Sequence, residues 1–225
     1  MPESSATGAL GVRRAGYPGK RLLDLAGSAV ALVLLAPVMA AVAAAVALTS
    51  RGPVVFRQER VGLHGRPFVF YKFRTMFHGA DDGVHRDFVA RLIRGEPIDS
   101  PAADNRSEGF KLQEDPRITP LGRFLRRTSL DELPQFLNVL RGDMSLVGPR
   151  PPLPYEAAQY SAWQRRRLAG KPGITGPWQV DGRSRVPFDE MVRMDLAYLE
   201  HASPGRDLRL LARTVFVVLR GDGAR

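Results

Sequence analysis

The hydrophobic pattern divides the 225-residue chain into one long apolar segment and a mixed remainder. Residues 22–48, LLDLAGSAVALVLLAPVMAAVAAAVAL, are almost wholly apolar, with Asp24 as the one charge near the start. A helix in a water-soluble core is rarely apolar on all sides over such a length. At about 1.5 Å per residue the segment would reach about 40 Å, enough to cross a hydrocarbon layer of about 30 Å. The pattern therefore predicts a membrane helix over residues 20–50.

Two features favour a helix that enters the membrane and returns to the same side. Pro37 lies near the middle, where it removes a backbone hydrogen bond and kinks the helix. Lysines and arginines near membrane segments mark the cytoplasmic side, and here they flank both ends: Arg13, Arg14, Lys20, Arg21, Arg51, Arg57 and Arg60. We expect a re-entrant helix kinked at Pro37 in the inner membrane, with the rest of the chain on the cytoplasmic face. A complete span, a signal peptide and a buried helix are the alternatives.

The remainder, residues 51–225, alternates strand-like and helix-like patterns separated by Gly and Pro. Residues 54–58 and 68–74 predict a β-hairpin, in which Lys72 and Arg74 emerge together at the end of a strand. Helical spacing of apolar residues predicts helices over four ranges, namely 81–94, 155–168, 187–202 and 207–220.

The helix over 207–220 interleaves arginines with apolar residues, which suits a membrane interface, docking against a partner or packing against its own domain. Residues 95–109 are polar and interrupted by proline, and predict a loop. Residues 1–19 are expected to form a disordered tail. The fold class is therefore α+β: a re-entrant membrane helix, then a mainly helical cytosolic domain with a small β-hairpin or sheet and interfacial amphipathic helices.

Charge and composition narrow the chemistry. The chain has 33 Lys and Arg against 23 Asp and Glu, which predicts attraction to nucleic acid, anionic lipid headgroups or phosphorylated substrates without choosing among them. The absence of cysteine excludes disulfides and thiolate chemistry. The four histidines show no metal-ligand spacing, so a zinc site is not expected. Catalysis would have to come from carboxylates, hydroxyls, histidines or bases.

Two adjacent carboxylates, Asp131 and Glu132, stand in RRTSLDELPQFLNVLRGDMSLVGPRP, residues 126–151. The stretch from Ser129 to Glu132 matches a capping box, which would make the pair an ordinary helix start. The same position would also supply free N–H groups and positive potential, which hold phosphate oxygens and keep a carboxylate ionised. An ionised aspartate among cations is a competent nucleophile toward phosphorus.

Transfer of a phosphoryl group depends mainly on neutralising charge, by Arg, Lys and commonly a divalent metal. The sequence offers no P-loop and no G-x-G-x-x-G or HExxH motif. It does offer basic residues within short distinctive motifs: Lys72, Arg74, Arg126, Arg150, Lys171 and Arg183.

These motifs carry a resemblance to a known family. KFRTM (72–76), LRRTSLDELPQFLNVLRGDMSLVGPRP (125–151) and KPGITGPWQVDGRS (171–184), behind an N-terminal KRLLDL helix, resemble the bacterial sugar transferases, the monotopic polyprenyl-phosphate phosphoglycosyl transferases. The resemblance runs from Lys20 to about Gly221, with the motifs in family order. Larger members add an N-terminal bundle of four membrane helices and a further domain, so the chain is expected to be the minimal catalytic form.

The resemblance implies a reaction and a set of roles. Asp131 would attack the β-phosphate of a nucleoside diphosphate sugar, UDP-sugar by expectation, and release UMP. Polyprenyl (undecaprenyl) phosphate would then take the phosphosugar, which begins the assembly of an exopolysaccharide, capsule, O-antigen or other glycoconjugate. Glu132 would position groups or handle protons, and Mg²⁺ would sit beside Asp131. The candidates for substrate binding are Lys72, Arg74, Arg126, Arg150, Lys171, Gln179 and Arg183.

The partners expected from the resemblance are a nucleotide sugar, polyprenyl phosphate and membrane lipid, with a homodimer left open and the sugar unidentified. An alternative function is a membrane-tethered basic adaptor that binds anionic lipid or nucleic acid. It gives no reason for Asp131 and Glu132, and the chain lacks the interleaving of aromatic and basic residues typical of nucleic-acid binding. A hydrolase of the same substrates is a third hypothesis, and it would not depend on the polyprenyl phosphate.

Overall fold

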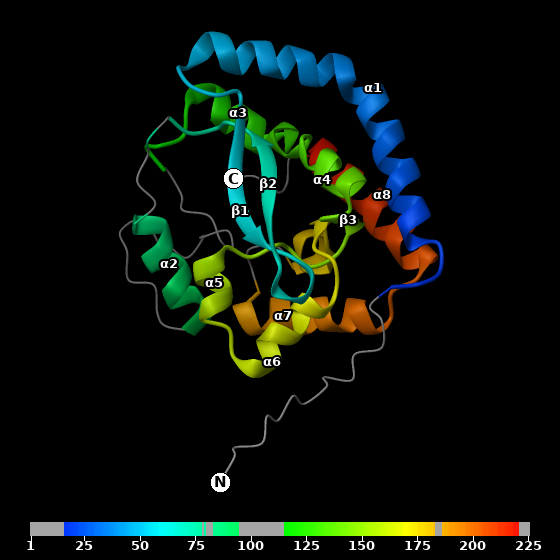
Figure 1. Ribbon diagram of the computed structural model, residues 1–225. Helices are drawn as coiled ribbons and strands as arrows, with labels where there is room; N and C mark the ends of the chain where they lie inside the picture. Colours follow the sequence, from blue (N-terminus) through cyan, green and yellow to red (C-terminus); the bar gives the residue numbers. More distant parts are fainter. Residues whose placement is uncertain (1–15, 78, 80–82, 95–114, 183–185, 221–225) are drawn as a thin grey trace.

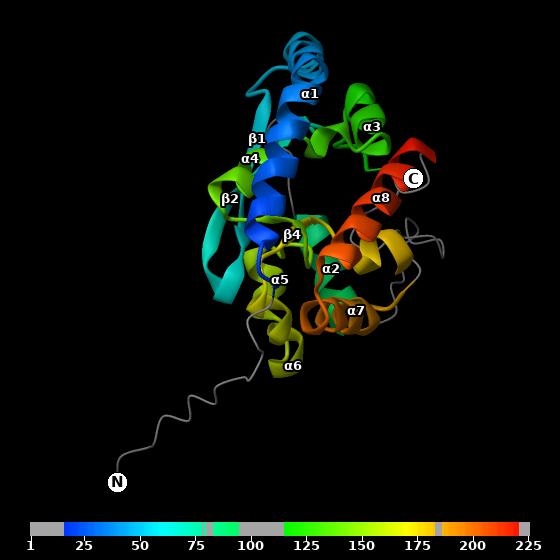
Figure 2. The same ribbon diagram turned by 90° about the vertical axis from the view of Figure 1, so that its right-hand side faces the viewer.

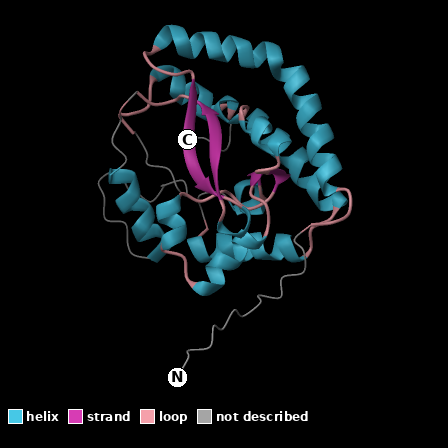
Figure 3. Ribbon diagram, viewed as in Figure 1, coloured by secondary structure: helices cyan, strands magenta, loops and turns pink. Residues whose placement is uncertain are grey.

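The structure is a computed structural model that describes residues 16–77, 79, 83–94, 115–182 and 186–220. The expected tail up to residue 15, the expected loop over 95–109 and Arg183 lie outside the described residues. Helices predominate, with two small sheets between them (Figure 3). The helices are α1 (Lys20–Thr49), α2 (Gly83–Arg94), α3 (Pro120–Arg127), α4 (Gln135–Arg141), α5 (Pro154–Ala158), α6 (Ala162–Arg165), α7 (Phe188–Glu200) and α8 (Pro204–Arg220), and the strands are β1 (Val55–Val61), β2 (Pro67–Phe73), β3 (Ser145–Val147) and β4 (Gly173–Thr175).

The predicted membrane helix is present as α1, which is long and apolar enough to span or anchor a membrane. The helix bends partway along its length (Figure 1), and Pro37 lies inside it. Its buried positions are few and follow one stripe, Asp24 and Ser28 in the first half and Val42 and Val46 in the second. The middle of the helix is far more exposed, with 74% of Val33 accessible.

Both ends of α1 are attached to the same globular domain. At the N-terminal end, Arg21 donates to the carbonyls of Val139 (2.6 Å) and Leu140 (2.8 Å), the last carbonyls of α4. Asp24 accepts from the Ser145 hydroxyl and the Leu146 amide at 2.9 Å each. These bonds fasten the start of α1 to α4 and β3.

At its C-terminal end, α1 is held by Arg74. The guanidinium donates to the carbonyls of Val46 (3.2 Å) and Ser50 (2.7 Å) and to the Ser50 hydroxyl (2.8 Å). It also donates to the carbonyl of Pro53. Since the last carbonyls of a helix have no intrahelical donor, the guanidinium acts as a side-chain cap.

The predicted hairpin is confirmed. β1 and β2 pair antiparallel, with Val55 opposite Phe73 and Val61 opposite Pro67. β3 and β4 pair parallel. The hairpin crosses the middle of the molecule, between α1 and α3 at one end and α5 and α6 at the other (Figure 1). Phe73 joins Val42, Val46 and Leu125 in one of three buried apolar clusters, so the strand end, α1 and α3 share a core.

The helices predicted over 81–94, 187–202 and 207–220 are confirmed as α2, α7 and α8. The single helix predicted over 155–168 is wrong. The chain there forms α5, α6 and a 3₁₀ turn, because a new helix starts at Ser161, whose backbone amide donates to the Gln164 side-chain oxygen (2.8 Å).

Helix α8 packs on its own domain, and its other face stays exposed and apolar. One face packs on its own domain through Asp207 and Leu210, which are buried. The other face exposes Leu208, Val215 and Phe216. The starts of α8 and α1 lie on the same side of the molecule (Figure 2), where the Lys20 to Asp207 ion pair (2.6 Å) joins them.

Candidate active site

The Asp131 and Glu132 pair lies on a 3₁₀ turn, Leu130–Glu132, between α3 and α4. Asp131 is buried, with 6% of its surface accessible. The turn contacts both α3 and β2, so it brings the carboxylates to the basic end of one helix and to the strand that carries Lys72. A charged carboxylate is stable in such a place only with cationic or hydrogen-bonding partners.

The capping box suggested by the sequence is wrong. Ser129 makes no capping hydrogen bond and has a φ of 56°, in the left-handed region where it does not act as an ordinary N-cap. Helix α4 starts only at Gln135, with Pro134 before it. The carboxylate pair is thus not explained as a helix start, and its surroundings must account for it.

Lys72 is one of the charged residues around Asp131 and Glu132. The half-buried side chain extends from β2 over the ring of Phe56, with Nζ 5.4 Å from the ring centre. Burial and then the Arg126 guanidinium lower the pKa of Lys72 to about 8, while the charges of Asp131 and Glu132 act in the opposite direction. Lys72, Arg126 and the carboxylate pair therefore form one electrostatic cluster.

Arg126 reaches the same cluster from the last turn of α3. Its Nε donates to the Thr75 hydroxyl (3.0 Å), which orients the guanidinium. Burial lowers the pKa of Arg126, and the charges of Asp131 and Asp115 oppose that effect. A Cβ on Gly122 would lie only 2.0 Å from the Thr75 carbonyl oxygen, so the glycine allows α3 to pack closely against Thr75.

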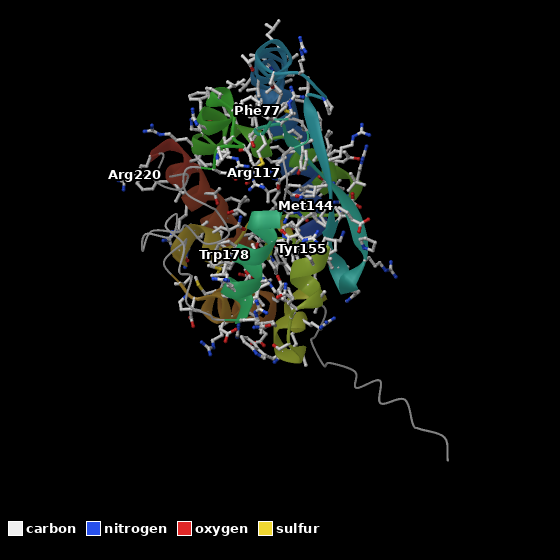
Figure 4. All side chains as sticks on the ribbon, turned by 90° about the vertical axis from the view of Figure 1, so that its left-hand side faces the viewer. Phe77, Arg117, Met144, Tyr155, Trp178 and Arg220 are labelled. Atoms are coloured by element: carbon white, nitrogen blue, oxygen red, sulfur yellow. The ribbon has the colours of Figure 1, made fainter. Side chains whose placement is uncertain are left out.

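Arg117 and Asp115 form an ion pair next to this cluster, and the sequence analysis missed both. Arg117 donates from Nε (2.8 Å) and Nη2 (2.6 Å) to the two carboxylate oxygens of Asp115. Burial raises the pKa of Asp115, but the hydrogen bonds from Arg117 outweigh it and hold the pKa below its usual value. Arg117 lies beside Phe77 (Figure 4), whose amide bonds the Arg117 carbonyl at 2.9 Å. No sequence motif marked this pair.

Arg150 belongs to a neighbouring group of buried charges. It forms an ion pair with the fully buried Glu156 (3.4 Å), and Arg60 donates to the Pro151 carbonyl (3.1 Å). Burial and then Arg150 lower the pKa of Arg60 to about 10. Arg60 in turn is one of the charges that act on Lys72. The cations thus form a continuous region from Arg126 to Arg150, with Glu156 and Arg60 as members that the sequence analysis missed.

Arg74 does not join the cluster. The prediction that Lys72 and Arg74 emerge together is wrong, because β2 ends at Phe73 and Arg74 turns to the C-terminal end of α1. Its donors bind backbone carbonyls there, so its position does not support the predicted role in substrate binding.

Lys171 and Gln179 also lie apart from the cluster that surrounds Asp131. The charges that act on Lys171 are those of Arg21, Asp24 and Asp143, at the far end of α4 from the carboxylate pair. Gln179 is half-buried, and its Nε2 donates to the Ile174 carbonyl (3.4 Å). Arg183, the remaining candidate, lies outside the described residues.

The residues present fit the way in which Mg²⁺ binds to phosphate substrates. The described residues contain no group of three or more His, Cys, Asp or Glu that could enclose a metal. Mg²⁺ rarely requires such a cage, since it usually keeps several waters and binds one or two carboxylates together with substrate phosphates. Asp131 and Glu132 offer that number of carboxylates.

A helix able to span or anchor a membrane, together with a carboxylate pair among lysine and arginine side chains in which Asp131 is buried, suggests the class: a membrane-associated protein with a site suited to a phosphate-bearing ligand. The chain belongs to the bacterial sugar transferase family, whose profile matches residues 15–221. The resemblance seen in the motifs is thereby confirmed.

Named relatives agree with the family. The chain is 44% identical over 209 residues to the galactosyl transferase CpsE of Streptococcus agalactiae, covering 92% of this chain and 43% of that protein. It is 42% identical over 205 residues to the undecaprenyl-phosphate galactose phosphotransferase of Salmonella typhimurium, covering 91% of this chain and 41% of that one. The UDP-glucose:undecaprenyl-phosphate glucose-1-phosphate transferase of Caulobacter vibrioides is 41% identical over 213 residues, with coverages of 91% and 71%. The chain thus spans less than half the length of the first two relatives.

Proposed function

We propose that the protein transfers a sugar phosphate from a nucleoside diphosphate sugar to polyprenyl phosphate, releasing a nucleoside monophosphate. The observation that carries the proposal is the buried Asp131 within a cluster that includes Lys72 and Arg126, on a domain joined to an apolar helix. The relatives named for UDP-glucose and undecaprenyl phosphate support a UDP-sugar as donor and undecaprenyl phosphate as acceptor.

In the first step, a carboxylate oxygen of Asp131 attacks the β-phosphorus of the donor. A new bond forms between this oxygen and phosphorus, and the bond from the β-phosphorus to the bridging oxygen breaks. UMP leaves with the bridging oxygen, and the sugar phosphate stays on Asp131 as a mixed anhydride. An ionised carboxylate needs no base for this attack, so neutralisation of the phosphate charge dominates the barrier.

In the second step, a phosphate oxygen of the polyprenyl phosphate attacks the same phosphorus. The bond to Asp131 breaks, the carboxylate is restored, and polyprenyl-diphosphate-sugar is released. Glu132 is adjacent to the reacting carboxylate, where it would position the acceptor or take the last proton of its phosphate. Such a product begins the assembly of an exopolysaccharide or related glycoconjugate.

The cations have distinct tasks in this scheme. Lys72 and Arg126, which act electrostatically on Asp131, would bind the oxygens of the phosphate under attack. Arg150, held by Glu156, would bind the phosphate of the nucleotide. Mg²⁺ would be held by Asp131 and the diphosphate, where it supplies further charge neutralisation.

The attachment of both ends of α1 supports a re-entrant arrangement on the cytoplasmic face. A helix that crossed the membrane would carry its two ends to opposite sides. Here Arg21 fastens the start of α1 and Arg74 fastens its end to one domain, and the exposed apolar middle projects between them. A domain that holds both ends of an embedded helix would lie on one side of the membrane, where it would meet a soluble donor and a lipid acceptor together.

The test is release of UMP by the detergent-purified chain with Mg²⁺, a set of UDP-sugars and polyprenyl phosphate. We expect release with one preferred sugar, and a loss on the order of 10⁴-fold or more in Asp131→Asn. Glu200→Gln removes an exposed carboxylate on α7 and serves as the control for charge and handling. Without acceptor, the intact mass of the wild-type protein should rise by the mass of one sugar phosphate. After proteolysis, the modification should lie on the peptide that contains Asp131. Unchanged turnover in Asp131→Asn would refute the nucleophilic role.

A further inference from the structure

A cavity of about 180 Å³ lies at the start of α1, apart from the cluster around Asp131. Lys20, Arg21 and Asp24 of α1 line it together with Lys171 and Tyr198. The charges acting on Lys171 are those of Arg21, Asp24 and Asp143, whereas those acting on Lys72 include Asp131 and Glu132. The two basic sites are therefore distinct.

Arg21 and Lys171 both line the cavity, and their charged ends approach each other beside Gly142. A Cβ placed on Gly142 would lie 3.5 Å from Arg21 Nη2 and 3.7 Å from Lys171 Nζ. Two like charges this close repel each other, and the carboxylates of Asp24 and Asp143 offset this repulsion only in part, since burial and then Arg21 still lower the pKa of Lys171. One oxygen of the Asp24 carboxylate is already engaged by Ser145 and Leu146.

The cationic side chains of the cavity differ in whether they already have hydrogen-bond or ion-pair partners. Lys20 is paired with Asp207 (2.6 Å), and the Arg21 guanidinium donates to the end of α4. Lys171 makes no hydrogen bond or ion pair within the described part of the chain, and it is half-buried. Its ammonium group is the donor left for a ligand.

Exposed apolar side chains stand next in sequence to charged residues at the starts of α1 and α8. Leu22 follows Arg21 on α1 and is 70% exposed, and Leu208 follows Asp207 on α8 and is 58% exposed. The starts of the two helices are joined here by the Lys20 to Asp207 ion pair. A ligand with a phosphate for the cations and acyl or prenyl chains for the leucines matches both parts of this surface.

We propose that this cavity binds the phosphate group of a membrane lipid and thereby holds the start of α1 at the membrane surface. The Lys171 ammonium donates to the phosphate oxygens, the charge of Arg21 attracts the phosphate, and the lipid chains lie along Leu22 and Leu208. The site is separate from the transfer reaction, and it exists whether or not Asp131 is the nucleophile.

The sequence permits a site-resolved test, because the chain has four lysines: Lys20, Lys72, Lys111 and Lys171. The full-length protein in neutral detergent is acetylated on its amines, and the rate at each lysine is read by mass spectrometry. Burial and then Arg21 lower the pKa of Lys171, which favours its reaction. The probes are short-chain phosphatidylglycerol, diacylglycerol with the same chains, polyprenyl phosphate, inorganic phosphate and a UDP-sugar.

We expect phosphatidylglycerol, at about ten times its Kd, to slow acetylation of Lys171 about tenfold and to leave Lys72 unchanged. A UDP-sugar should slow Lys72 and leave Lys171 unchanged. Stronger protection by polyprenyl phosphate than by phosphatidylglycerol would identify the prenyl lipid as the ligand. Equal protection by diacylglycerol or by inorganic phosphate, or no protection by any lipid phosphate, would overturn the proposal.

A matched pair of variants gives a second measurement. Lys171→Gln should weaken binding to phosphatidylglycerol vesicles about fivefold, as expected for one basic residue at an anionic surface. Arg193→Gln removes an exposed cation on α7 and should leave binding unchanged. Equal binding of the two variants would also contradict the proposal. Neither measurement requires turnover, so their failure is distinguishable from failure of the transferase function.

Discussion

The lowered pKa of Lys72 makes the first step of the reaction sensitive to pH in a defined range. Lys72 must be protonated to neutralise a phosphate, and its pKa is about 8 in the free protein. We therefore expect kcat/KM for the donor to be constant near pH 7 and to fall about tenfold by about pH 9. The second ionisation of the acceptor phosphate, near about pH 6, affects only the acid side.

As the pH rises, the lowered pKa of Lys72 decreases activity but increases the free energy of unfolding. A loss of activity caused by deprotonation of Lys72 can therefore be distinguished from a loss caused by unfolding. The pKa of Lys72 is lower in the folded protein than the 10.5 of an unperturbed lysine. Between about pH 8 and about pH 10.5 the unfolded chain therefore binds more protons, and the contribution of Lys72 to the free energy of unfolding rises with pH. A fall in kcat/KM above about pH 8 is thus not unfolding caused by Lys72.

The assay is single-turnover release of UMP without acceptor, measured across this pH range in three proteins. Lys72→Arg keeps its charge at all these pH values and should lose the alkaline decline. Lys72→Gln should be slow throughout and independent of pH here. Arg193→Gln, the exposed control, should follow the wild-type profile. A wild-type profile that stays constant to about pH 9, or an unchanged decline in Lys72→Arg, would refute the assignment.

Two further substitutions test the framework of the site. Gly122→Ala would place a Cβ 2.0 Å from the Thr75 carbonyl oxygen, so α3 must move away, and we expect a loss of more than about 2 kcal/mol in unfolding measurements. Gly205→Ala, which meets nothing within 4 Å at the start of α8, is the control and should change stability by less than about 1 kcal/mol. Arg74→Met should lower the free energy of unfolding by about 2–4 kcal/mol, because the last carbonyls of α1 lose their donor, and the KM of the folded protein for the donor should stay unchanged. A raised KM in a variant of unchanged stability would instead show that Arg74 binds the substrate.

The sequence predicted the helices and strands better than it predicted the contacts that their side chains make. Periodicity located the hairpin, α1, α2, α7 and α8, because their apolar spacing extends over enough residues to be distinctive. It failed over 155–168, where a local cap at Ser161 divides a continuous apolar pattern. The capping box at Ser129 failed for a related reason: the match to the motif is local, but the backbone there follows the packing of α3 and α4 on the hairpin.

Long-range contacts explain the members of the site that were missed. Arg60 was counted only as a flanking charge of the membrane helix, yet it lies under the Pro149–Pro151 turn and bonds a residue 91 positions away. Glu156 resembles an ordinary residue in the first turn of a helix, and only the fold shows that it neutralises Arg150. A strand pattern gives the face on which a side chain lies but not the partner that it meets there.

The consecutive residues 72–75, at the end of strand β2, contact different parts of the molecule. Lys72 faces the carboxylate pair, Phe73 enters the core shared with α1 and α3, and Arg74 caps the end of α1. Thr75 accepts from Arg126 through its hydroxyl and from the Thr119 amide through its carbonyl (3.0 Å). The strand end therefore connects the membrane helix, the core and the basic cluster within four residues. A shift of α1 in the membrane would be transmitted to Lys72 through this short backbone, so the attachment of the helix and the geometry of the site cannot vary independently.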